Sequence, residues 1–175
     1  ERIEAVGISN QRETFLLWDK QGNPLCNAII WQCKRAVSVC EQLKDSDIEG
    51  QIKARTGLIL DPYFSGAKLA WLLEHDDRVK RAAANDDIFF GTVDTWLLFK
   101  LTSGESYLTD YTNASRTLLF NIHTLEWDDI LMDAFGCSTL RMPGVVPSSY
   151  TFGTSDFSGL FPQPVSITGM VGDSH

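Results

Sequence analysis

Charged side chains directly follow two apolar segments of the sequence that have the character of β-strands. Residues 3–8 lead into Arg12 and Glu13, and residues 165–172 lead into Asp173. Ligands of open α/β sheets bind just beyond the carboxyl ends of the strands. An Arg offers only hydrogen-bond donors, and an ionised Glu or Asp offers only acceptors. The pattern predicts a site for a small polar molecule, the alternative being charged side chains on solvated loops.

Five longer segments of the chain resemble the motifs of one family, in the order in which that family has them. They are Asn10-Gln11-Arg12-Glu13-Thr14, Ile30-Trp31-Gln32-Cys33, Asp61-Pro62-Tyr63-Phe64-Ser65-Gly66, Gly91-Thr92-Val93-Asp94-Thr95-Trp96-Leu97 and Asp110-Tyr111-Thr112-Asn113-Ala114-Ser115-Arg116-Thr117. These segments are similar to those of glycerol kinases, a branch of the FGGY carbohydrate kinases. The resemblance implies an α/β fold of the ribonuclease-H-like (actin/hexokinase-like ATPase) type with a largely helical insertion.

The resemblance implies a role for each charged residue at the strand ends. Asp173 matches the family's general base, which takes the proton of the attacking hydroxyl. Phosphoryl transfer depends mainly on positioning and charge stabilisation, so a weak base such as Asp suffices. Arg12 and Glu13 match the pair that contacts glycerol, whose adjacent hydroxyls both donate and accept hydrogen bonds. Ser174 stands where the family commonly has a substrate-binding Gln and would offer a shorter polar contact.

Two aromatic residues, Trp31 and Tyr63, match positions that lie beside glycerol in the family. An indole can cover the C–H face of a polyol, and a Tyr hydroxyl can donate or accept a hydrogen bond. Packing in the hydrophobic core is the alternative for both residues. The polar residues of the other matching segments are expected either to be structural or to support the site residues, namely Asp94, Asp110, Asn113, Ser115 and Arg116.

The activity that the resemblance implies is ATP-dependent phosphorylation of glycerol to sn-glycerol 3-phosphate. The sequence contains neither a Walker-type phosphate loop nor a dinucleotide-binding glycine motif. ATP and Mg²⁺ are therefore expected to bind mostly to parts of the enzyme outside this chain. Two alternatives stay open, which are an FGGY kinase for another polyol or ketose and a non-catalytic sugar-binding fragment.

The two ends of the sequence indicate that residues 1–175 belong to a longer protein. The chain opens inside an apolar segment without an initial Met, and it stops just after another such segment. We expect residues 1–175 to form an incomplete first, substrate-binding domain of an FGGY kinase that is inactive alone. The resemblance implies that the phosphate-binding hairpin lies upstream of this chain and the nucleotide domain downstream of it. It also implies that the full-length enzyme is a homo-oligomer.

Two buried strands, residues 3–9 and 165–171, are expected to form the core sheet, with a largely helical insertion between them. Apolar runs around a polar turn predict a hairpin over residues 15–30. Helices are predicted over residues 34–44, 78–84, 93–101 and 128–135, between Asp47 and Gly57, and after Ser65 with Leu69, Leu72 and Leu73 facing inward. Asp47 and Ser65 are expected to cap their helices, and Gly57 and Gly136 to end theirs. Residues 106–122 show no clear period and are expected to be irregular, and residues 143–164 a long loop.

The composition excludes several classes of function. A formal net charge of −8 disfavours nucleic-acid binding, and no apolar run reaches membrane-spanning length. The four cysteines lack the close pairs of a zinc site, and the three histidines share no ligand spacing, so no metal site is predicted. Cys33 and Cys40 share a helical stripe with Val37 and are expected in the core. A cytoplasmic location is the expectation for such a chain.

Overall fold

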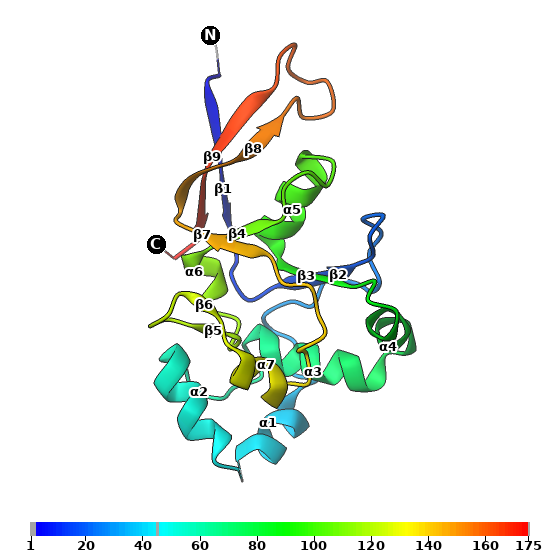
Figure 1. The fold of residues 1–175 in the computed structure, drawn as a ribbon, viewed down its shortest axis with the longest axis vertical. Coiled ribbons are helices and arrows are strands. Elements are labelled where there is room, and N and C mark those ends of the chain that lie inside the picture. The colour runs from blue at the N-terminus through cyan, green and yellow to red at the C-terminus, as the bar shows by residue number, and fades with distance from the viewer. Residues whose placement is uncertain (1–2, 45, 175) are drawn as a thin grey trace.

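A three-stranded sheet joins the two ends of the chain in the computed structural model, which describes residues 3–44 and 46–174. Its strands are β1 (Ala5–Asn10), β9 (Val165–Gly172) and β8 (Ser149–Ser155), in that order. β1 runs parallel to β9, and β8 runs antiparallel to it. Figure 1 shows β1 and β9 both running from the outer end of the sheet toward the helical part of the molecule. The carboxyl ends of the first and last strands therefore meet at one edge.

The insertion between β1 and β8 combines helices with short strand pairs. The helices are α1 (Val37–Lys44), α2 (Ile48–Thr56), α3 (Ser65–His75), α4 (Asp77–Ala84), α5 (Val93–Leu101), α6 (Tyr111–Ala114) and α7 (Asp129–Ala134). β2 (Phe15–Trp18) pairs antiparallel with β3 (Phe89–Thr92), and β5 (Phe120–Asn121) with β6 (Glu126–Trp127). β4 (Leu108–Asp110) pairs parallel with β7 (Gly144–Val146). The prediction of an α/β domain with a largely helical insertion is confirmed.

Local signals explain where the helices begin and end. Gly57 ends α2 in the left-handed region, with φ 71°, and donates its N–H to the Lys53 carbonyl. Such a conformation is easiest for glycine, which has no Cβ. Asp76 and Asp128 cap α4 and α7 by accepting hydrogen bonds from the first backbone N–H groups of each helix. These helices lie where the sequence predicts them.

Two hydrophobic clusters hold the molecule together. The larger one lies in the helical part and includes Phe15, Leu69 and Phe90 among its buried side chains. The smaller one joins one face of the sheet to α5 through Ile8, Leu98, Phe152, Ile167 and Met170. In Figure 1, α5 lies beside the sheet while α1, α2, α3 and α7 gather at the other end of the molecule. None of the helices in the described part of the chain has the length and apolar character needed to span a membrane.

The prediction that residues 106–122 and 143–164 are irregular was wrong. The first segment contains β4, α6 and β5, and the second contains β7 and β8. The pairs β4–β7 and β5–β6 are three and two residues long, which is too short for a period to show. β8 is rich in Ser, Thr and Gly, and its register with β9 is interrupted between Ser149 and Gly153. Pairing with a distant strand, not local propensity, makes it a strand.

Other expectations need smaller corrections. Residues 25–30 are not a strand, although isolated bridges tie Pro24 and Ile29 to β2, whose main partner is β3. Ser65 begins α3 without capping it, and its hydroxyl donates to the Glu13 carbonyl oxygen at 3.3 Å. Asp47 stands at the N-cap of α2 without a side-chain hydrogen bond to that helix.

The burial of β1 and of Cys33 also differs from the expectation. In β1 only Ile8 and Asn10 are buried, because α5 covers one face of the sheet and the other face is exposed. Cys40 is buried as predicted, whereas Cys33 precedes α1 and is half-buried. Its Sγ accepts a hydrogen bond from Arg35 Nε at 2.9 Å.

Candidate active site

The structure brings together the strand ends that carry Arg12 and Asp173. The Asp173 N–H donates to the carbonyl oxygen of Asn10, the last residue of β1, at 3.0 Å. The Arg12 side chain lies directly against Gly172, where an added Cβ would come within 2.2 Å of Arg12 Cδ. Only a glycine lets the side chain approach the strand so closely. Arg12 and Asp173 are thereby neighbours although they are 161 positions apart in the sequence.

Glu13 lies next to this strand end, buried in a network of polar side chains. Its Oε1 accepts a hydrogen bond from Arg116 Nε at 2.8 Å, and the Glu13 side chain is only 5% exposed. The Arg116 guanidinium also lies over the Phe64 ring, 4.9 Å from its centroid. Burial raises the pKa of the Tyr63 hydroxyl, and a hydrogen bond to the Glu13 carboxylate raises it further. The carboxylate is thus held by a cation and a phenol.

The two aromatic residues named from the sequence are in contact with each other. The Trp31 and Tyr63 ring centroids are 5.7 Å apart, and both side chains are more than a third exposed. They line a cavity of about 210 Å³ together with Asp61 and Cys33. Core packing, the alternative for these residues, is therefore excluded. The exposed rings can cover the C–H face of a small ligand.

A local turn orients Tyr63. The Asp61 carboxylate accepts the Tyr63 N–H at 2.8 Å, and the Asp61 carbonyl accepts the Phe64 N–H at 3.2 Å. An Asp that binds the backbone two residues later, followed by Pro, is a typical turn sequence. The turn leads straight into α3, so the Tyr63 backbone is fixed at the start of a buried helix.

Asp173 and Ser174 are exposed at the end of β9. The Ser174 hydroxyl donates to Asp173 Oδ1 at 3.4 Å. An exposed carboxylate at a strand end is accessible to a substrate hydroxyl, which a general base requires. His175, which follows Ser174 at the end of the sequence, lies outside the described residues.

A buried polar network lies behind the end of β1. The Asn10 side chain donates to Asp94 Oδ1 at 3.2 Å and to Asn113 Oδ1 at 2.9 Å. Asp94 Oδ2 accepts the Thr109 hydroxyl at 2.7 Å. Asp94 is fully buried, and its burial raises the pKa of its carboxyl. These bonds hold the last residue of β1, whose carbonyl binds Asp173, in one position.

The same network continues to the end of β9. Asn113 donates its side-chain amide to Asp110 Oδ1 at 2.8 Å, and Asp110 also accepts the Ser148 hydroxyl at 2.6 Å. The Thr112 hydroxyl donates to Asp110 and accepts the Gly172 N–H at 2.8 Å. Both strand ends are therefore anchored by one set of buried and half-buried side chains. The expectation that Asp94, Asp110 and Asn113 are structural or support the site residues agrees with this geometry.

Sequence reasoning missed one residue of the site. Arg116 was expected either to be structural or to support the site residues, and it is the ion-pair partner of Glu13. Lys68 was not considered, although its side chain is fully buried and bonds to the carbonyls of Glu13, Ile30 and Tyr63. A signal for Lys68 was present, because it stands one helical turn before the inward-facing Leu72.

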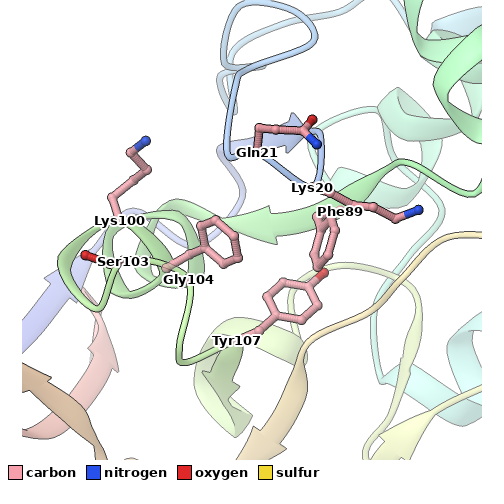
Figure 2. Close-up of a pocket in the computed structure, with 8 residues that line it drawn as sticks. Lys20, Gln21, Phe89, Lys100, Ser103, Gly104 and Tyr107 are labelled. Carbon is pink, nitrogen blue, oxygen red and sulfur yellow. The ribbon is translucent and has the colours of Figure 1, made fainter.

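A second hollow lies away from these residues. Figure 2 shows it beside the turn after β2 and the end of α5. Its volume is about 500 Å³. The Phe89 and Tyr107 rings meet there at 5.0 Å, and the Lys100 side chain extends away from them. The Tyr107 hydroxyl is hydrogen-bonded to the Phe90 and Arg141 carbonyls, so its role is structural. None of the site residues expected from the sequence lines this hollow.

Nothing in the described part of the chain resembles a metal site. No group of three or more His, Cys, Asp or Glu side chains in residues 3–44 and 46–174 could hold a metal ion. The residues described here can bind hydroxyl groups, cover a C–H surface and accept a proton.

Comparisons with known proteins identify what the chain is similar to. A family model described as the N-terminal domain of the FGGY family of carbohydrate kinases matches residues 1–174. The glycerol kinase of Shewanella pealeana is 49% identical over 174 residues, and that of Escherichia coli O8 (strain IAI1) is 47% identical. Each alignment covers 99% of this chain and 35% of the relative. The chain thus spans about a third of the length of the curated relatives it matches.

Solved structures share the fold. The crystal structure of Plasmodium falciparum glycerol kinase with ADP has a TM-score of 0.91 and 34% identity, covering 99% of this chain and 35% of that chain. A gluconate kinase from Lactobacillus acidophilus has a TM-score of 0.86 at 22% identity, a likeness of fold alone. These matches confirm the expected fold class, an α/β domain of the actin/hexokinase-like ATPase type.

Proposed function

Because the chain belongs to the FGGY family of carbohydrate kinases, we propose that it is part of the first, substrate-binding domain of an ATP-dependent glycerol kinase. The reaction transfers a phosphoryl group from ATP to glycerol and yields sn-glycerol 3-phosphate. The observation that carries the proposal is the contact between the two strand ends. It brings the Arg12 side chain against Gly172, the residue directly before Asp173.

Each residue of the site has a defined part in the proposed reaction. Asp173 accepts the proton of the terminal glycerol hydroxyl as its oxygen attacks the phosphorus atom. Arg12 donates hydrogen bonds to glycerol hydroxyls, and Glu13 accepts them. Trp31 and Tyr63 cover the carbon chain, and Ser174 offers a further hydroxyl beside the base. Positioning and charge stabilisation supply most of the acceleration in such reactions.

ATP and Mg²⁺ enter the proposal through the longer protein. Within the described residues no group of three or more His, Cys, Asp or Glu side chains could hold a metal ion. We assign the nucleotide and its Mg²⁺ mostly to parts of the enzyme outside this chain. A homo-oligomeric, cytoplasmic full-length enzyme completes the proposal.

A phosphorylation assay of the full-length protein across a panel of polyols and ketoses tests this function. Glycerol is expected to have the highest kcat/KM, because the curated relatives that the chain matches at 47–49% identity are glycerol kinases. If a pentulose shows a higher kcat/KM than glycerol, that ketose is the substrate in place of glycerol. Binding of glycerol without phosphorylation of any compound would favour a non-catalytic sugar-binding protein instead.

Substituting Gly172 by Ala tests the contact on which the proposal depends. A Cβ there would meet Arg12 Cδ at 2.2 Å and Cγ at 2.5 Å, so the Arg12 side chain must leave its position. Losing its charged hydrogen bonds is expected to raise the KM for glycerol about tenfold or more. Steady-state kinetics measure the change, and Gly50→Ala in α2 serves as the control because a Cβ there meets open space and its backbone is helical. An unchanged KM in Gly172→Ala would argue against a role for Arg12 in binding.

A further inference from the structure

One lysine side chain connects the backbone of the segments that carry the proposed glycerol ligands. Lys68 Nζ donates to the carbonyl oxygens of Tyr63 at 2.7 Å, Ile30 at 3.3 Å and Glu13 at 3.4 Å. Glu13 and Tyr63 are themselves proposed ligands, and Ile30 directly precedes Trp31. Segments 55 and 38 positions away from Lys68 thus converge on a single amine.

The cost of burying this charge indicates that it does more than fill space. Lys68 is fully buried, and lysine is among the residues least often found so. A buried ammonium is destabilising unless its donors are satisfied, and an apolar side chain of similar volume would often serve stability equally well. An ammonium has three donors, which matches the three carbonyls that it contacts.

The surroundings of Lys68 are mixed in charge. Burial lowers the pKa of Lys68 to about 8. The charges of Cys33, Glu13 and Asp61 raise the pKa of Lys68, and the charge of Arg35 lowers it further. Burial by itself would raise the pKa of the Cys33 thiol, but the hydrogen bonds from Arg35 and the charges of Arg35 and Lys68 together lower it.

We propose that Lys68 is a positioning residue of the glycerol site, whose amine holds the backbone of Glu13, Ile30 and Tyr63 together so that Glu13, Trp31 and Tyr63 face one ligand. The inference rests on the proposed function. Asp173 follows β9 and is anchored through Asn10 and Thr112, not through Lys68. Lys68 therefore affects how tightly glycerol is held and has little influence on the proton transfer.

The substitution Lys68→Met in the full-length protein tests this role, because Met keeps most of the volume and removes the donors. Calorimetric titration with glycerol is expected to show about 10- to 100-fold weaker binding, as for lost hydrogen bonds from a charged group. The turnover number at saturating glycerol is expected to stay within about threefold. The matched control is Leu72→Ala, a buried change in the same helix that lowers stability but leaves glycerol affinity within about twofold. Equal affinity of Lys68→Met and the unmodified protein would overturn the inference.

A pH series on the unmodified protein tests the inference even if Lys68→Met fails to fold. A neutral amine donates two hydrogen bonds where the ammonium donates three, so glycerol affinity is expected to fall as pH rises through about 8. Cys33→Ser separates the two titrating groups: it removes a thiolate whose charge raises the pKa of Lys68, so the fall in affinity should persist with its midpoint at a lower pH. A flat profile from pH 7 to 9.5, or one abolished by Cys33→Ser, would contradict the inference. Failure of the unmodified protein to bind glycerol at any pH would instead overturn the proposed function, and the inference with it.

Discussion

Replacing Asp173 by Asn in the full-length protein is expected to lower the turnover number about 10²–10⁴-fold, the usual effect of losing a general base. An Asn side chain has nearly the same size, but its amide cannot take the proton of a hydroxyl group. The backbone N–H at this position still binds the Asn10 carbonyl, so the strand ends stay together. Glycerol affinity is therefore expected to change less than about threefold. Steady-state kinetics and calorimetric titration with glycerol measure the two effects.

The matched control for this experiment is Asp156→Asn. Asp156 is also exposed and also directly follows a strand, β8. Because β8 is antiparallel to β9, Asp156 lies by the beginning of β9, at the opposite end of the sheet from Asp173. Its substitution should leave turnover unchanged. Near-normal turnover in Asp173→Asn would remove Asp173 as the base, and loss of glycerol binding would reassign it to substrate binding.

Glu13→Gln is expected to raise the KM for glycerol about 10- to 100-fold with a smaller change in turnover. The substitution removes a charged acceptor, and a hydrogen bond to a charged group contributes about 1.5–3 kcal/mol, where 1.4 kcal/mol corresponds to about a factor of ten. It also leaves the Arg116 guanidinium, which is 25% exposed, without its carboxylate partner at 2.8 Å. Steady-state kinetics at saturating ATP separate KM from turnover.

Two further variants sharpen the Glu13 experiment. Glu126→Gln changes an exposed Glu on β6 and should leave the KM unchanged. Arg116→Gln in the Glu13→Gln background should add little, because residues of one ion pair act together and their effects are not additive. A KM for glycerol within about twofold of the unmodified value in Glu13→Gln would show that the carboxylate does not bind substrate.

Much of the local structure follows from short-range chemistry that the sequence displays. The helices α2, α4, α5 and α7 lie close to their predicted ranges, and Gly57 ends α2 in the conformation that glycine favours. The apolar run of residues 165–172 forms β9 with nearly the predicted bounds. Periodicity, caps and terminators act over a few residues, so a single sequence reveals them.

The strands of residues 106–122 and 143–164 were missed for the opposite reason. β4 and β7 are three residues each, and they become strands only because segments 36 positions apart pair in parallel. β8 carries Gly153 with φ 147° and several polar residues, which is typical of a loop by composition. Pairing with β9 makes this segment a strand, and no local sequence pattern indicates such a partner.

The residue types of the candidate site were visible in the sequence, and their arrangement was not. An Arg-Glu pair after one strand, an Asp after another, and two aromatic residues in turns could all be named from the chain alone. Only the tertiary structure paired Glu13 with Arg116 across 103 positions and drew three backbone segments to Lys68. The physical reason is that strand order and loop packing decide which remote groups meet, whereas the chemistry of each group belongs to the residue itself.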